Sequence, residues 1–146
     1  KIMKSILASE LMVGNWLNFT FMNVTETLKV HHILPHLIGV DANIQYQLEM
    51  CSGIPLTPEI LLKAGFENVP NFTVMNSMTL SVGRGRILSI GCVGTPNEML
   101  FLSDEEDGKI DNIIVLHNFD YDGKLYLHRL QNFYQLLTQT ELQITL

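Results

Sequence analysis

Short runs of β-forming residues, broken at close intervals by turns, constrain the fold of this 146-residue chain more than any other feature. The tight turn Gly83-Arg84-Gly85 separates two such runs, so we expect a β-hairpin there. An acidic loop, 103–109, separates two more runs and predicts a second hairpin. The expected strands lie within a strand-rich stretch over 11–51, which includes 30–33 and 43–51, and then at 72–82, 86–93, 98–102, 110–119 and 141–146.

Two segments have helix patterns instead. Thr57 can cap the first free N–H groups of a helix, Pro58 suits its first position, and Gly65 can end it in a left-handed conformation. The second helix is predicted over 127–138, where apolar residues recur at helical spacing. Its apolar stripe consists of Leu127, Leu130, Phe133, Tyr134 and Leu137.

The balance of strands and helices predicts an α+β fold. We expect mainly antiparallel strands, in a barrel-like or highly curved sheet, with one short central helix and one C-terminal helix. The length suits a single domain over 1–146. A subdivision into a strand-rich part, 1–53, and a second part, 54–146, is the alternative.

Composition and charge exclude several classes of protein. Hydrophobic residues make up 47% of the chain, which excludes a disordered protein, and the charged fraction of 16% is low for a soluble domain. The net charge of −6 disfavours nucleic acid as a partner, and no apolar run is long enough for a membrane span. Eight acidic residues and one lysine fall within 98–122. We expect this acidic lobe to face solvent, away from any self-associating surface.

The polar face of the predicted C-terminal helix is the most unusual surface in the sequence. His128, Gln131, Asn132 and Gln135 lie on it at spacings of three and four, with Gln139 beyond them. An ordinary solvated helix face would be rich in Lys and Glu. The amide groups can therefore bond the backbone of a neighbouring segment, which is the structural interpretation, or they can bind a partner or ligand.

The second candidate site is the turn that carries Arg84 and Arg86. Two guanidinium groups beside exposed backbone N–H groups can hold a phosphate or carboxylate. The alternative is a hairpin turn with solvated charges. The turn lacks the spacing of a nucleotide-binding motif.

Metal and catalytic chemistry have weaker signals. His31, His32 and His36 suggest a metal cluster, but in a strand the first two point to opposite faces, so we expect no metal and no cofactor. A hydrolase would need His128 with Asp120 or Asp122 in one cleft, and no catalytic motif is present. An enzyme is therefore the less favoured class.

Three segments together resemble a family of short uncharacterised proteins encoded in phages and mobile elements of gut Bacteroidales. The matching segments are 10–16 (ELMVGNW), 54–66 (IPLTPEILLKAGF) and 128–134 (HRLQNFY) with Leu137, Thr138, Glu141 and Leu142. Met12 stands where the family pattern has Arg, and Gln139 stands where it has Gly. The resemblance implies a location in the bacterial cytoplasm and brings no established activity.

These observations leave three hypotheses open. The first is a small soluble, non-catalytic interaction module from a phage or mobile element, with a second copy or a host or phage protein as its partner. The second is a binder of a small phosphate-bearing host metabolite or signal, through Arg84 and Arg86 or the residues around His128. The third is a hydrolase that uses His128.

Overall fold

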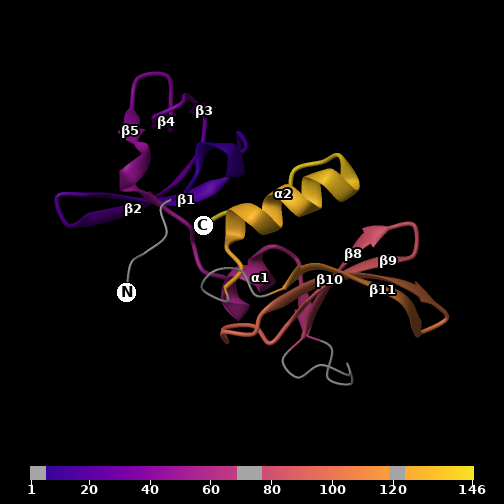
Figure 1. The fold of residues 1–146 in the computed structure, drawn as a ribbon. Coiled ribbons are helices and arrows are strands. Elements are labelled where there is room, and N and C mark those ends of the chain that lie inside the picture. The colour runs from indigo at the N-terminus through magenta and orange to yellow at the C-terminus, as the bar shows by residue number, and fades with distance from the viewer. Residues whose placement is uncertain (1–5, 69–76, 119–123) are drawn as a thin grey trace. The chain divides into compact units, whose positions relative to one another are not determined.

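The computed structural model describes residues 6–68, 77–118 and 124–146 (Figure 1). Antiparallel strands dominate, and two α-helices accompany them, so the predicted α+β class is confirmed. The helices are α1 (Pro58–Lys63) and α2 (Leu127–Thr138), with short 3-10 turns at Ala8–Glu10 and Leu48–Met50. The strands are β1 (Trp16–Phe21), β2 (Val24–Lys29), β3 (His32–Ile33), β4 (Leu37–Gly39), β5 (Gln45–Gln47), β6 (Cys51–Ser52), β7 (Glu67–Asn68), β8 (Met78–Gly83), β9 (Arg86–Gly91), β10 (Met99–Glu106) and β11 (Lys109–Asn118).

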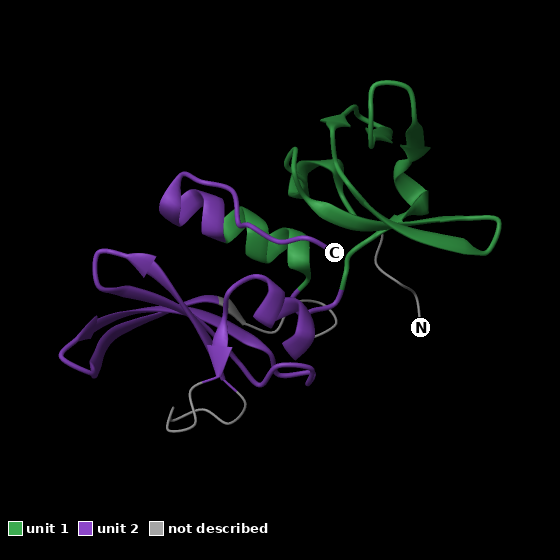
Figure 2. Ribbon diagram, turned by 180° about the vertical axis from the view of Figure 1, so that it is seen from behind, with its two compact units in different colours: residues 1–54, 126–133 green, residues 55–125, 134–146 purple. Residues whose placement is uncertain are grey.

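The chain divides into two compact units (Figure 2). Unit 1 comprises residues 1–54 and 126–133, and unit 2 comprises residues 55–125 and 134–146. The first boundary, at Ile54, lies next to the subdivision that the sequence offers as an alternative. Helix α2 contributes its first seven residues to unit 1 and the remainder to unit 2.

Unit 1 contains two small sheets, in the orders β2-β1-β6 and β3-β4-β5. In β1 the side chains alternate between buried and partly exposed up to Phe19, because one face of the strand packs on a core. Leu17 and Phe19 lie at the centre of that core, where the Tyr46 ring packs 4.8 Å from the Phe19 ring, centre to centre. Its buried members are Ile6, Leu11, Leu17, Phe19, Val30, Ile38 and Cys51.

Unit 2 contains one five-stranded sheet in the order β11-β10-β9-β8-β7. Figure 1 shows β8–β9 and β10–β11 as two hairpins, as the sequence predicts. Arg84 and Gly85 form the turn of the first hairpin with φ values of 57° and 70°, a combination that matches the twist of the flanking strands. The central strand β9 is buried from Leu88 to Gly91.

The predicted signals for α1 act as expected. The Thr57 side chain accepts a hydrogen bond from the backbone N–H of Ile60 at 3.3 Å, and Pro58 is the first helical residue. Gly65 ends the segment with a φ of +90°. In α2, Leu127 and Leu130 are fully buried, as the apolar stripe predicts.

Several strand predictions differ from the structure. The described strands form three separate open sheets, not one barrel-like or highly curved sheet. Residues 141–146 form no strand. Leu142 and Ile144 are buried and their neighbours are exposed, so the predicted alternation of buried and exposed side chains is present, but the segment pairs with no described strand. The predicted strand 43–51 shortens to β5 because a 3-10 turn replaces its second half. The predicted acidic loop is strand up to Glu106, and 72–76 lie outside the described residues.

Neither described helix is long and apolar enough to cross a membrane.

Candidate functional site

The amide side chains on the first half of α2 bind backbone groups of unit 1. The Gln131 side chain accepts a hydrogen bond from the Trp16 backbone N–H at 2.9 Å and donates one to the Gly14 carbonyl at 3.1 Å. Asn132 donates to the Glu10 carbonyl at 2.7 Å and accepts from the Asn15 side chain at 2.9 Å. These contacts agree with the structural interpretation, because they use the amide groups inside the fold.

Segment 10–16 and helix α2 are also two of the segments that carry the resemblance to the phage-encoded family. Asn15 closes the loop in this segment by accepting a hydrogen bond from the Met12 backbone N–H at 2.8 Å. The third segment joins them at its first residue, since the Leu127 N–H donates to the Ile54 carbonyl at 2.9 Å. Segment 10–16, the first half of α2 and Ile54 therefore form one connected set of contacts within unit 1.

His128 lies in the same region and is 1% exposed. Its Nε2 is 3.6 Å from Glu10 Oε2, and the Arg129 guanidinium reaches the same carboxylate oxygen at 3.7 Å. Burial lowers the pKa of His128 to about 4; the Glu10 carboxylate opposes this shift and Arg129 adds to it. His128 is therefore neutral at pH 7, and its ring stacks with Tyr126 at 6.1 Å between centres.

This burial limits the chemistry that His128 can perform. A general base must reach its substrate, but almost none of this side chain is accessible. Asp120 and Asp122, the expected partners of a hydrolase, lie outside the described residues. Gln135 is half-buried in the second half of α2, and its side chain makes no hydrogen bond to a described residue.

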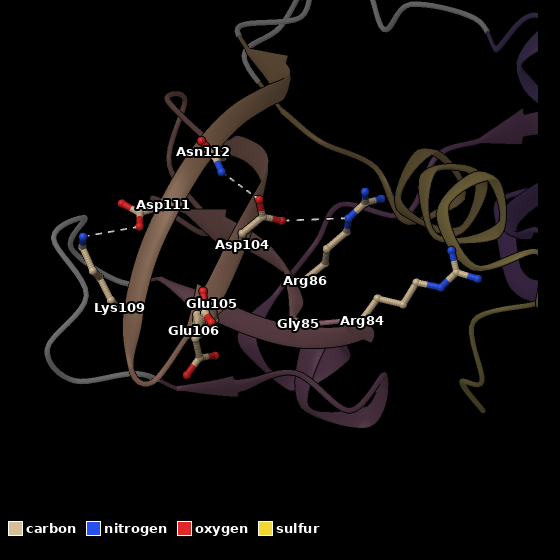
Figure 3. Close-up of a pocket in the computed structure, with 9 residues that line it drawn as sticks. All are labelled: Arg84, Gly85, Arg86, Asp104, Glu105, Glu106, Lys109, Asp111 and Asn112. Atoms are coloured by element: carbon tan, nitrogen blue, oxygen red, sulfur yellow. Dashed lines mark hydrogen bonds and ion pairs between the residues drawn. The ribbon is translucent and has the colours of Figure 1, made fainter.

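Arg84 and Arg86 line a hollow of about 510 Å³ in unit 2 (Figure 3). Arg86 Nε lies 3.9 Å from Asp104 Oδ1, and the Asn112 amide donates to the other oxygen of Asp104 at 3.0 Å. The Arg84 side chain points away from these carboxylates in Figure 3. The full lining is Arg84, Gly85, Arg86, Asp104, Glu105, Glu106, Lys109, Asp111 and Asn112.

The charges of this hollow do not suit an anion. The lining contains three cationic side chains and four carboxylates, so a phosphate would meet more negative than positive charge. The sequence pattern showed the two arginines, but it did not show that β10 and β11 would bring acidic residues beside them.

The histidines near residue 32 are arranged differently from the expectation. No group of three His, Cys, Asp or Glu side chains among the described residues could hold a metal ion. The expectation that His31 and His32 point to opposite faces was wrong, because their Nδ1 atoms lie 3.2 Å apart. His31 precedes strand β3, so strand alternation does not apply to it.

Glu98 is a buried carboxylate that sequence reasoning placed in the solvent-facing acidic lobe. It is 2% exposed. Its two oxygens accept hydrogen bonds from the backbone N–H groups of Gly94 at 2.8 Å and Leu125 at 2.9 Å. The prediction was right for Asp104–Asp107 and Asp111, which are exposed, and wrong for this residue.

The outer strand of the five-stranded sheet is the surface that sequence reasoning missed. Ile113, Ile114 and Val115 are 57%, 57% and 53% exposed. They are consecutive in β11, which is the last strand of the sheet, so its outer edge pairs with no other described strand. Long apolar edge strands are unusual because they invite pairing with another chain. The signal in the sequence was a run of four apolar residues, 113–116, without alternation.

The pairing of β10 with β11 has two register shifts near this exposed segment. The pairing of β10 with β11 is regular at Leu102↔Ile114 and Phe101↔Val115 and shifts register on either side of these two pairs. One shift falls near Asn112, which has a φ of 53°. Bulges of this kind bend a strand but leave the central pairs in place.

Comparisons with protein-family models, curated proteins and solved structures find no match for this chain. The resemblance to the phage-encoded family therefore stays a prediction. A proposal about function therefore depends on the exposed residues of this chain.

Proposed function

We propose that this chain is a non-catalytic interaction module and that the edge strand β11 is its partner surface. The exposure of Ile113, Ile114 and Val115 on an edge strand supports this most strongly. An added strand would satisfy edge N–H and C=O groups and cover these side chains. Completing the burial of each half-exposed side chain contributes roughly 1 kcal/mol.

The other two hypotheses have less support from the side chains that they need. A binder of phosphate-bearing molecules would use Arg84 and Arg86, but Arg86 already lies beside the Asp104 carboxylate. A hydrolase would use His128, which is buried against Glu10 and Arg129. The remaining parts of the proposal, a phage or mobile-element origin and action in a bacterial cytoplasm, are supported by the resemblance alone.

A capture experiment tests the proposed function. Tagged chain is used as bait in bacterial cells that also express an untagged copy, and the bound proteins are identified by mass spectrometry. We expect wild type to retain a partner, either the untagged copy or another protein, and Ile114→Lys to lose it. A charge on the exposed edge of a strand opposes pairing.

The matched control is Leu136→Lys, because Leu136 is also an exposed apolar residue of unit 2, at 75%, but lies on α2. It should retain the partner. A partner that Ile114→Lys retains as well as wild type does, or no partner at all, would contradict the proposal.

A further inference from the structure

We propose that a second copy of this chain occupies the β11 edge, paired antiparallel about a two-fold axis at Ile114. This inference rests on the proposed function and names its partner.

The exposed apolar residues of β11 are symmetric about Ile114. The three exposed apolar residues are centred on it, so a two-fold axis there places Ile114 opposite its own copy and Ile113 opposite position 115 of the other chain. Asp111 then faces position 117, so no two carboxylates are opposite each other.

The distribution of charge along the β10–β11 hairpin favours antiparallel pairing of two copies. The exposed acids Asp104–Asp107 and Asp111 gather at the turn between β10 and β11. Parallel pairing of two copies would place the two acidic turns side by side, and like charges so close are unfavourable. Antiparallel pairing about Ile114 separates the two Asp111 residues by six strand positions, roughly 20 Å, and the two turns by more, beyond the range of screened repulsion.

A two-fold contact between two β11 edges closes the assembly at two chains. An isologous two-fold contact uses the same edge on both copies and leaves no free β11 for a third chain. The pairing therefore ends at a dimer and does not continue into a fibre. The register shifts on either side of Ile114 and Val115 limit the regular contact to a short segment, so we expect a weak dimer that depends on protein concentration.

Complementary charges at position 114 test the register. Ile114→Lys and Ile114→Glu are prepared separately and as an equimolar mixture, and their association is measured by sedimentation equilibrium. Each variant alone places like charges opposite each other, so its dimer dissociation constant should rise roughly tenfold or more above that of wild type. The mixture should recover dimer, because Lys then faces Glu. Urea unfolding of each variant checks that the chain remains folded.

The matched control is the pair Ile113→Lys and Ile113→Glu. Position 113 faces position 115 in the proposed register, so mixing these two variants should recover much less dimer. A second readout is disulfide formation by Ile114→Cys in a Cys92→Ser background, in which the remaining Cys51 is buried. Ile114→Cys should form a disulfide-linked dimer faster than Ile113→Cys does in the same background.

Failure of this inference is distinguishable from failure of the proposed function. Equal recovery by the 113 and 114 mixtures, or no recovery by either, overturns the register. A wild-type chain that stays monomeric while β11 captures another protein overturns the second copy and leaves the interaction module standing. A monomeric chain with no β11-dependent partner overturns both.

Discussion

A buried amide side chain stabilises a fold when both its donor and its acceptor find partners. Gln131 is 3% exposed and meets this condition through Trp16 and Gly14. At the residue scale, the sequence showed that the helix face was unusual and offered a structural and a functional interpretation. It could not choose between them, because the partners lie more than a hundred positions away in the chain.

Replacing Gln131 by alanine should therefore destabilise unit 1. The Gln131→Ala variant leaves the part-buried backbone N–H of Trp16 and carbonyl of Gly14 without these partners, and we expect a loss of about 2 kcal/mol in the free energy of unfolding. Urea unfolding followed by the fluorescence of Trp16, the single tryptophan of the chain and part of unit 1, measures it. Gln135→Ala, four residues along the same helix, is the control and should cost much less. Equal losses in the two variants would be inconsistent with this role for Gln131.

His128 makes the stability of unit 1 depend on pH. Its pKa is about 4 in the folded chain, against an ordinary value of 6.5. The unfolded chain therefore binds a proton at higher pH than the folded chain does. The stabilisation is fully present above pH 6.5 and is lost as the pH falls toward 4, by up to about 3 kcal/mol.

The comparison of wild type with His128→Phe isolates this effect. We expect the free energy of unfolding to fall more steeply in wild type than in the variant between pH 7 and pH 4.5, because Glu10 and Arg129 are present in both chains. Parallel pH profiles would show that His128 does not cause the change.

At the scale of elements, the helices were predictable because their signals are local. Thr57, Pro58 and Gly65 each act on backbone groups within a few residues. Strand pairing was only partly predictable, since it depends on which distant edge is free. The segment 141–146 has the alternation of a strand, but no ladder forms there. The hairpin predictions were right because a short turn brings two neighbouring strands together, as at Arg84-Gly85.

The end of α2 offers a prediction at this scale. Gln139 has a φ of 58°, a left-handed conformation that favours glycine, and its N–H bonds the Gln135 carbonyl at 2.8 Å. Gln139→Gly should stabilise the chain by about 1 kcal/mol because it removes the strain of the side chain. Gln135→Gly, inside the helix, should destabilise it by a similar amount. Differential scanning calorimetry measures both, and a lower melting temperature for Gln139→Gly would contradict this account of the helix end.

At the scale of the whole molecule, the summed charge of the sequence pointed away from the surface that we propose as the interface. The acidic lobe, 98–122, was expected to lie away from any self-associating surface. The structure places acidic and exposed apolar residues on the same β10–β11 hairpin, the acids near its turn and Ile113–Val115 along its outer strand. A charge summed over 25 residues hides such a division, and the edge position of β11 follows only from the order of the sheet.

Hydrogen–deuterium exchange of β11 tests the central claim, that this edge binds a partner, most directly. Exchange of the amides in a peptide spanning 109–118 is measured at low and high protein concentration, and with any captured partner. We predict slower exchange in the associated state of wild type and no change in Ile114→Lys. Association that leaves β11 exchange unchanged, while another segment becomes protected, would contradict the account.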